Sequence, residues 1–266
     1  MIRNTAVYVG NGRVLVRTAR GFKLFVDAND VSLAPHLIID GVWEEHVERA
    51  LRTVVKRGMQ VLEVGANVGF FTVLFAHAVG TSGAVDAFEP DPALAALVRD
   101  NAEINGFHEI VCLHELALTD SIGTAEFFTR DRHRGNGTLM PSLEQIPWNP
   151  SDRPAAITVR TTTLDAHVAA TGRRPDLVKI DAEGAEPAVL RGAQELLSDG
   201  KPLVLILELI PAFLRSAGED PQAFLEHLAA HGFRLRFIEE RRRARIVDAS
   251  VETLLQRRYS ELLLVR

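Results

Sequence analysis

The amino-acid sequence predicts a doubly wound α/β fold built on a mainly parallel sheet of seven strands. Short apolar runs alternate along the chain with longer stretches whose apolar residues have helical spacing, which is typical of right-handed βαβ units. The apolar runs are continuous, as expected of strands buried on both faces of a parallel sheet. A glycine-rich turn joins the first of these strands to the helix that follows it.

The chain begins with a different pattern. Three short segments alternate apolar and polar residues, and Asn11-Gly12 and Arg20-Gly21 separate them, so we expect small β-hairpins there. Helical spacing then predicts a helix over residues 44–56. The expected strands cover residues 60–64, 84–88, 110–114, 177–180, 203–207, 234–238 and 262–265. The expected helices between them cover residues 70–79, 92–105, about 187–197 and about 221–230. No helix of ordinary length precedes the last strand, so we expect an antiparallel edge strand.

We expect one domain over residues 1–266, with an N-terminal β-hairpin extension over residues 1–42 and the α/β core over residues 43–266. Residues 123–160 interrupt the core. This segment contains a polar stretch and then Pro141, Pro147, Pro150 and Pro154. A connection this long without regular structure is usually a functional loop or disordered, so we predict a loop insertion.

The composition of the chain argues against several classes of function. The chain has 266 residues, a formal net charge of -5 and a pI of about 6.0, which gives no general electrostatic reason to bind nucleic acid or an anionic membrane. Its one cysteine, Cys112, lies in an apolar stretch and is interpreted as a core residue; no Cys/His set has zinc spacing. No signal peptide or membrane span is indicated, so we expect a cytoplasmic protein. The basic run at Arg241, Arg242, Arg243 and Arg245 is interpreted as a solvated hairpin.

The strongest motif is VLEVGANVGFFT, residues 61–72, where the first core strand meets the first helix. Gly65 permits a sharp turn, and Gly69 permits a close approach of helix and strand. Asn67 stands where a dinucleotide-binding turn has its middle glycine, and the third glycine comes one residue early. This departure favours a ligand with a carboxylate tail over one with a pyrophosphate.

Two acidic motifs follow. Glu89 ends the second core strand, where an acidic residue binds a ribose diol and repels a 2′-phosphate, so NADP is disfavoured. The alternative is an acid at a helix N-terminus. Asp181, Glu183 and Glu186 follow the fourth strand, and they repel one another unless a cation, a proton or a donor lies among them. The alternative there is an acidic first helical turn that matches the helix dipole.

Several segments together resemble the FkbM-type methyltransferase family. In chain order they are VLEVGANVGFFT, AFEPDP, Asn101 with Asn105-Gly106, ELALTD, TTLDAHV and KIDAEGAEPAVLRGAQELL. The resemblance covers roughly residues 43–208. It implies a class I methyltransferase fold, which is Rossmann-like, and S-adenosylmethionine as the cofactor.

The resemblance also implies roles for single residues. Gly65, Asn67 and Gly69 would line the methionine end of the cofactor, and Glu89 would take the ribose. Ala117 and Leu118 would flank the adenine. Glu44, preceded by Trp43, would reach the amino acid end. Glu63 stands where the family usually has Asp. Because glutamate and aspartate both carry a carboxylate, we expect Glu63 to be a cofactor-binding residue as well.

Methyl transfer from a sulfonium requires alignment, exclusion of water and often removal of a proton from the acceptor. Asp181 and Glu183 are the predicted catalytic residues, with Asp181 also close to the cofactor, and His133 is a second candidate base. The cation among the carboxylates is the sulfonium or a metal; we predict no metal, with magnesium as the rival interpretation.

The resemblance favours O-methylation of a hydroxyl on a small metabolite or sugar. N-methylation of an amide or amine is the alternative reaction. A cofactor-binding module without catalysis is the alternative from a different class. The expected partner is a small-molecule acceptor, with no nucleic acid and no membrane, and the sequence does not give the oligomeric state.

Overall fold

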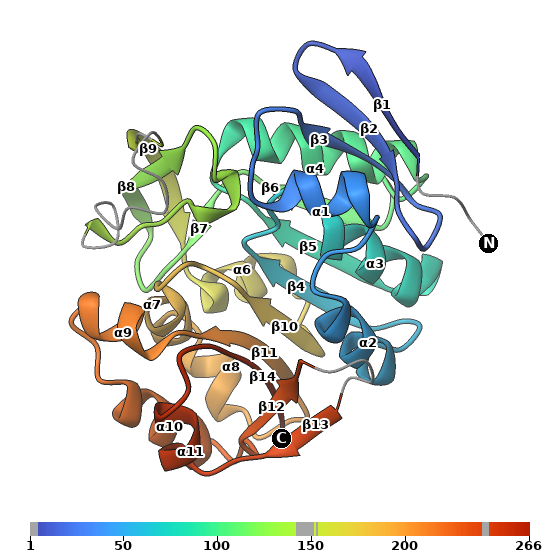
Figure 1. The fold of residues 1–266 in the computed structure, drawn as a ribbon. Helices are drawn as coiled ribbons and strands as arrows, with labels where there is room; N and C mark the ends of the chain where they lie inside the picture. The colour runs from blue at the N-terminus through green and yellow to red at the C-terminus, as the bar shows by residue number, and fades with distance from the viewer. Residues whose placement is uncertain (1–4, 142–151, 153, 241–244) are drawn as a thin grey trace.

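The structure is a computed structural model that describes residues 5–141, 152, 154–240 and 245–266. Its centre is a sheet of eight described strands in the order β13-β12-β14-β11-β10-β4-β5-β6 (Figure 1). The five strands from β11 to β6 pair in parallel, as predicted. The strands are β4 (Gln60–Val64), β5 (Ala84–Phe88), β6 (Val111–His114), β10 (Leu177–Ile180), β11 (Val204–Leu209), β12 (Arg236–Glu239), β13 (Arg245–Asp248) and β14 (Ser260–Val265).

Two predictions about this sheet are wrong. It has eight described strands instead of seven, because β13 adds to β12 in an antiparallel pair. The last strand, β14, is antiparallel to β11 as expected, but it lies between β11 and β12 and not at the edge. Its residues are almost all buried, which suits an interior strand with both faces covered. The β12–β13 pair agrees with the expected hairpin, although Arg241, Arg242 and Arg243 lie outside the described residues.

Helices cover both faces of the sheet. Helices where the pattern predicted them are α2 (Glu45–Val54), α3 (Phe70–Val79), α4 (Pro92–Ile104), α7 (Glu186–Arg191), α8 (Gln194–Ser198) and α10 (Pro221–Ala230). Those not predicted are α1 (Leu33–Ile39), α6 (Leu164–Thr171), α9 (Pro211–Ser216) and α11 (Val251–Leu255). The single helix expected over about 187–197 is interrupted at Gly192, where an added Cβ would lie 2.2 Å from the carbonyl oxygen of Thr119.

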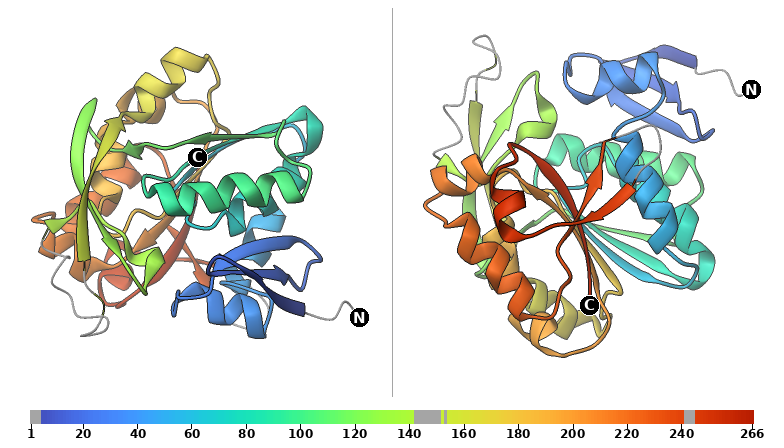
Figure 2. Two further views of the ribbon diagram at one scale, coloured as in Figure 1. Left: turned by 90° about the horizontal axis from the view of Figure 1, so that it is seen from above. Right: turned by 60° about the horizontal axis from the view of Figure 1, so that its bottom comes forward.

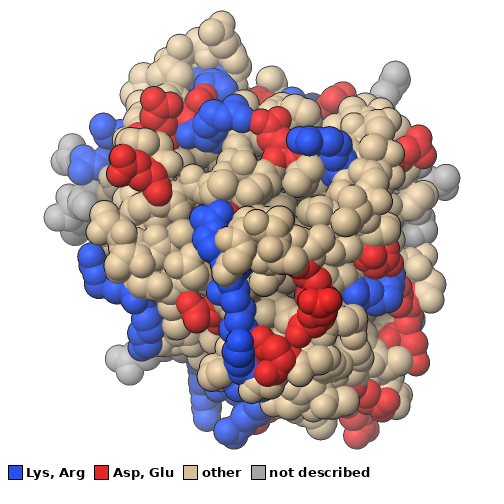
Figure 3. Space-filling view, turned by 180° about the vertical axis from the view of Figure 1, so that it is seen from behind, with Lys and Arg blue, Asp and Glu red and all other residues tan. Residues whose placement is uncertain are grey.

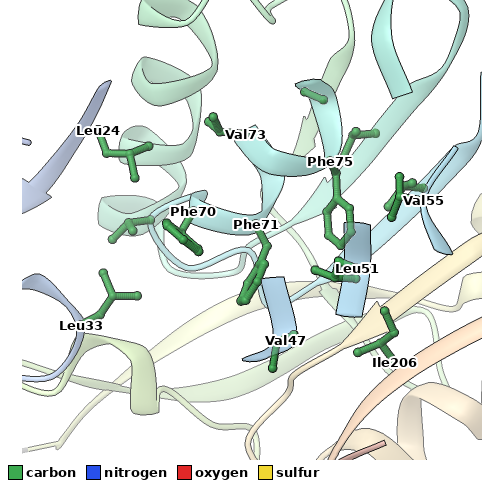
Figure 4. Packing of buried hydrophobic residues seen from close by; sticks show 14 of the residues in the cluster. Leu24, Leu33, Val47, Leu51, Val55, Phe70, Phe71, Val73, Phe75 and Ile206 are labelled. Carbon is green, nitrogen blue, oxygen red and sulfur yellow. The ribbon is translucent and has the colours of Figure 1, made fainter. Parts of the chain in front are cut away.

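Successive strand residues point to opposite faces and enter two separate apolar clusters. Val61 and Leu177 join helices α1 to α4 in the first cluster, whereas Leu62 and Val178 join α6 to α11 in the second. Figure 4 shows part of the first cluster, in which α2 and α3 pack together with residues of the N-terminal segment. Cys112 on β6 is half-buried and free.

Two small sheets accompany the large one and lie well apart in both views of Figure 2. The first consists of β1 (Thr5–Gly10), β2 (Arg13–Arg17) and β3 (Lys23–Asp27), and its antiparallel pairing confirms the predicted hairpins. The second consists of β7 (Ala117–Leu118), β8 (Gly123–Arg130) and β9 (Pro154–Thr162) in the order β7-β9-β8. The predicted loop over residues 123–160 is therefore wrong at both ends, where strands form. Pro147 and Pro150 lie outside the described residues.

A buried asparagine fastens the N-terminal sheet to the core. Asn101 on α4 is fully buried; its side-chain oxygen accepts the N–H of Phe25 at 2.6 Å. Its amide group donates to the carbonyl oxygens of Phe25 at 3.0 Å and Val68 at 2.7 Å. One side chain thus connects β3, α4 and the turn after β4.

The face shown in Figure 3 carries basic and acidic side chains interspersed with uncharged surface. Among the described residues, no helix combines the length and the apolar character needed to cross a membrane.

Candidate active site

A cavity of about 220 Å³ opens where the parallel strands β4, β5, β10 and β11 end. Residues at or just beyond these ends line it: Val64, Gly65, Phe88, Glu89, Asp181 and Glu208. Open α/β sheets bind their ligands at this edge. Residues from α1 and from the segment after β8 complete the walls.

The turn after β4 is built on glycine because another turn crosses it. Gly65 has φ 79°, and a Cβ there would lie 1.9 Å from the carbonyl oxygen of Asp181. Asn67 also has a positive φ, 54°. Gly65 and Asn67 line the cavity, whereas Gly69 is not among its lining residues and approaches Val98 of α4 instead. The backbone of this turn can therefore line the cavity only because residue 65 has no side chain, since a Cβ there would push the Asp181 carbonyl out of place.

Glu89 is a buried acid held in place by backbone. Its carboxylate accepts the N–H of Asn67 at 2.7 Å and the N–H of Asp91 at 2.9 Å, and it lines the cavity. Burial raises the pKa of Glu89 to about 8, although the two N–H groups oppose this shift. The helix-terminal role belongs to Asp91, whose side chain accepts the N–H of Ala93 at 2.8 Å at the start of α4. Glu89 remains available to the cavity.

Part of the cavity wall is apolar. Ala117 and Leu118, which form β7, are 5% and 2% exposed and line the cavity together with Phe88, Phe127 and Leu139. Such a wall suits a weakly polar part of a ligand.

Glu44, next to Trp43, contributes an unsatisfied oxygen. It lies just before α2 with φ 42° and lines the cavity. Its Oε2 atom is buried and has no hydrogen-bond partner among the described residues. Burial raises the pKa of Glu44, and the charges of Glu261 and Asp181 raise it further. Such an oxygen is costly unless a donor or a cation reaches it.

Glu63 lies elsewhere. It is 1% exposed, accepts the hydroxyl hydrogen bond of Thr72 at 2.6 Å, and is not among the residues that line the cavity. It is on the face of β4 that α3 covers. Burial raises the pKa of Glu63 to about 7, even though Lys179 and Thr72 lower it.

The acidic cluster in the structure contains Glu208 in place of Glu186, which the sequence had predicted as a member. Asp181 and Glu183 line the cavity, and an oxygen of each lies within 4.8 Å of an oxygen of Glu208 on β11. Glu186 instead turns away and accepts the N–H groups of Ala182 at 3.0 Å and Gly184 at 3.3 Å. Glu208 was not predicted, although a parallel pairing of the strand ends would have placed it beside Asp181: Ile180 pairs with Leu207.

Negative charge dominates the cluster. Lys179, buried on β10, donates to Asp181 Oδ2 at 2.8 Å. Burial alone would lower the pKa of Lys179, but Asp181 and Glu261 raise it above its ordinary value. Burial raises the pKa of Glu183 and Glu208, and neighbouring carboxylates add to both shifts. The close approach of these carboxylates therefore favours the binding of a proton or a cation among them.

His133 does not reach the cavity. Its Nδ1 atom lies 2.8 Å from Asp152 Oδ2, and it is not a lining residue. The next residues do line the cavity: η2 (Arg134–Asn136) brings Gly135 so close to Asn67 that an added Cβ would lie 2.8 Å from its side-chain nitrogen. Val31 donates to the carbonyl oxygen of Arg132 at 2.8 Å, so the N-terminal segment and the segment after β8 meet beside the cavity.

The fold is a doubly wound α/β sheet whose carboxyl edge holds the cavity. A family model described as "Methyltransferase FkbM domain" matches residues 63–235, well over half of the chain. The chain belongs to this family, it is a methyltransferase, and S-adenosylmethionine is its cofactor.

Solved structures with similar folds include several methyltransferases. Cofactor-bound Rv0187 from MTB is 16% identical, with 84% of this chain and 80% of that chain covered and a TM-score of 0.48. An O-methyltransferase from Bacillus cereus in complex with SAH is 14% identical, with 87% and 84% covered and a TM-score of 0.49. The O-methyltransferase TomG from Streptomyces achromogenes is 14% identical, with 83% and 77% covered and a TM-score of 0.44. A comparison with curated proteins found no significant match.

Proposed function

We propose that the enzyme methylates a hydroxyl group on a small metabolite or sugar. The observation that carries the proposal is the pair of carboxylates, Asp181 and Glu183, that face the cavity beside a buried lysine. A hydroxyl is a weak nucleophile until its proton has an acceptor, and a positioned carboxylate supplies one. The cavity of about 220 Å³, to which two chain segments outside the sheet contribute walls, supports a small-molecule acceptor over a macromolecule.

We assign the cofactor to the cavity in one orientation. Glu89 accepts the ribose hydroxyls, and Ala117 and Leu118 flank the adenine. Gly65 and Asn67 line the methionine end, and the unsatisfied Glu44 Oε2 accepts from the ammonium group. In this assignment Gly69 and Glu63 shape the turn from behind and do not touch the cofactor. When bound, the cofactor supplies an electrophilic methyl group.

The two catalytic carboxylates have different tasks. Lys179 holds one oxygen of Asp181, which fixes the other for orienting the acceptor hydroxyl. Glu183 takes the proton, because it lines the cavity beside Asp181 and because burial raises its pKa, which makes it a stronger base than a solvated carboxylate. The acceptor oxygen would lose its proton to the Glu183 carboxylate as it takes the methyl group, and the cofactor would leave as S-adenosylhomocysteine.

Magnesium is the rival explanation of the cluster, since Asp181, Glu183 and Glu208 offer the oxygen ligands that it prefers. We expect activity to survive chelation. If activity vanishes with a chelator and returns with Mg²⁺ but not with Zn²⁺, the carboxylates are ligands and the general-base role is wrong.

The test measures S-adenosylhomocysteine formation with panels of hydroxylated and amine acceptors. We expect Glu183→Gln and Asp181→Asn each to lower turnover at least about a hundredfold, the scale of a lost general base. Cofactor affinity should stay within about tenfold, or about 1.4 kcal/mol. Glu226→Gln, an exposed acid on α10, is the matched control and should change neither quantity.

Each other outcome favours a different function. Turnover with amines alone indicates N-methylation. Cofactor binding without turnover on any acceptor indicates a binding module. Wild-type turnover in both acidic variants means that the cluster is structural.

A further inference from the structure

A second group of chemically active side chains lies outside the cofactor cavity. It contains Asp86 on β5, His114 at the end of β6 and His167 on α6, and one ligand atom of each lies within 4.8 Å of the others. Asp86 and His167 are 5% and 8% exposed. The group lies on the face of the sheet that α6 covers, and none of its members lines the cofactor cavity.

One atom of this group lacks a partner. The Nε2 atom of His167 is buried and makes no hydrogen bond with any described residue. Asp86 Oδ1 lies 3.6 Å from this nitrogen, which is too long for a hydrogen bond. A buried polar nitrogen left in this state costs about 1–3 kcal/mol unless another ligand satisfies it.

The distances fit a tetrahedral ion. Zn²⁺ binds imidazole nitrogen and carboxylate oxygen at about 2.0–2.2 Å, so neighbouring ligand atoms in a tetrahedral site lie about 3.3 Å apart. His114 Nε2 lies 2.9 Å from Asp86 Oδ1, and His167 Nε2 lies 3.6 Å from the same oxygen. These two separations bracket the tetrahedral value.

We propose that Asp86, His114 and His167 bind one zinc-like divalent transition-metal ion, with the fourth position open to water. Two imidazoles and one carboxylate form a ligand set that zinc accepts with an open position. The ligands come from three separate elements, so no sequence spacing reveals them.

Arg173 forms an ion pair with the carboxylate of Asp86 in the structure without a bound ion. Its Nη2 atom donates to Asp86 Oδ1 at 2.8 Å, and its side chain is 37% exposed. The guanidinium is thus a competing cation that can withdraw to solvent. Removing it should strengthen metal binding, which is the opposite of the effect expected for a structural partner.

Bound metal would also act on the cofactor site. The Phe88 ring stacks on His114, with centroids 4.6 Å apart, and meets His167 edge-on at 5.0 Å. Phe88 lines the cofactor cavity. Fixing the two imidazoles would therefore fix one wall of that cavity.

The test titrates Zn²⁺ into the chelator-stripped full chain against a competing chelator. We expect one equivalent to bind tightly, with affinity lowered at least about a hundredfold in His114→Gln and in His167→Gln. Arg173→Ala should bind Zn²⁺ several-fold more tightly than wild type, and it keeps the core intact if the histidine variants fold poorly. Co²⁺ should give the absorption of a four-coordinate site in wild type and lose it in His167→Gln.

The control is the double variant His227→Ala, His231→Ala. These two histidines lie next to each other at the end of α10, with ring centroids 4.4 Å apart, and are the competing surface site. The double variant should leave tight binding unchanged. Absence of tight binding in wild type, its loss in the double variant, or weaker binding in Arg173→Ala would overturn the proposal.

Discussion

Glu89 offers the most direct test of the cofactor site at the scale of one residue. Its carboxylate lies in the cavity and is held by the N–H groups of Asn67 and Asp91. Glu89→Ala should weaken S-adenosylmethionine binding by about 1–3 kcal/mol, because ribose hydroxyls would lose their acceptor. Glu89→Gln keeps one acceptor oxygen and should fall between. Calorimetry measures both, and equal affinity in wild type and Glu89→Ala would reject the assignment.

Glu63 should make stability depend on pH. Burial raises its pKa from 4.5 to about 7, so between these values the folded protein holds a proton that the unfolded chain has released. The free energy of unfolding therefore falls as pH rises through this window, by up to about 1.4 kcal/mol per pH unit from this group. Above about pH 7 the contribution is lost.

Urea unfolding between pH 5 and 8 measures this slope. The slope is proportional to the number of protons released on unfolding, and Glu63→Gln should lower that number by about one. Glu226→Gln should leave the slope as in wild type. An unchanged slope in Glu63→Gln would mean that Glu63 is ionised in the folded state.

The sequence predicted those cavity residues whose position depends only on the strand that they directly follow. Gly65 and Glu89 follow strands directly, and the ends of neighbouring parallel strands meet at one edge. It could not find Glu208 without the register of β10 against β11. It grouped Glu63 with the cofactor residues, yet the alternation of side chains along β4 directs Glu63 towards α3.

The crossing of two turns makes a prediction at the scale of elements. In Gly65→Ala, the new Cβ would collide with the carbonyl oxygen of Asp181, and the residue would keep a left-handed φ of 79°. We expect the free energy of unfolding and the free energy of cofactor binding each to fall by at least about 3 kcal/mol. Gly106→Ala is the matched control, because Gly106 has φ 75° and nothing within 4 Å of an added Cβ. Thermal unfolding should show only a small loss there, of about 1–2 kcal/mol, and similar losses in both variants would contradict the crossing.

Elements with strong local signals were predicted closely, and those that depend on distant partners were not. Helix α3 starts after Gly69 and ends before Gly80, as its apolar stretch indicates. The strand β9 begins at Pro154 within a proline-rich segment, and its pairing with β8 is what makes it a strand. The place of β14 likewise depends on which strands it meets, and periodicity carries no such information.

At the scale of the whole molecule, we propose that residues 1–266 form one cooperative domain. Asn101 joins β3, α4 and the turn after β4 through three hydrogen bonds to Phe25 and Val68. Tryptophan fluorescence and far-ultraviolet circular dichroism should therefore report one unfolding transition. Asn101→Ala should lower stability by about 1–3 kcal/mol for each backbone group left unsatisfied.

Asn105→Ala is the comparison, since Asn105 makes a similar pair of bonds with Lys23 but in an exposed position. It should cost less than Asn101→Ala. Two separate transitions in the wild-type protein would show that the N-terminal sheet and the core unfold independently.

The place of β14 also governs the order in which the chain can fold during synthesis. The strand β12 leaves the ribosome before β14, yet β14 lies between β12 and the parallel strands. Until β14 emerges, β11 has one edge without a neighbour, and the β12–β13 hairpin has no sheet to join. An unpaired strand edge on a nascent chain is open to association with other chains. In the interval between the synthesis of β11 and that of β14, this edge of β11 is therefore open to such association.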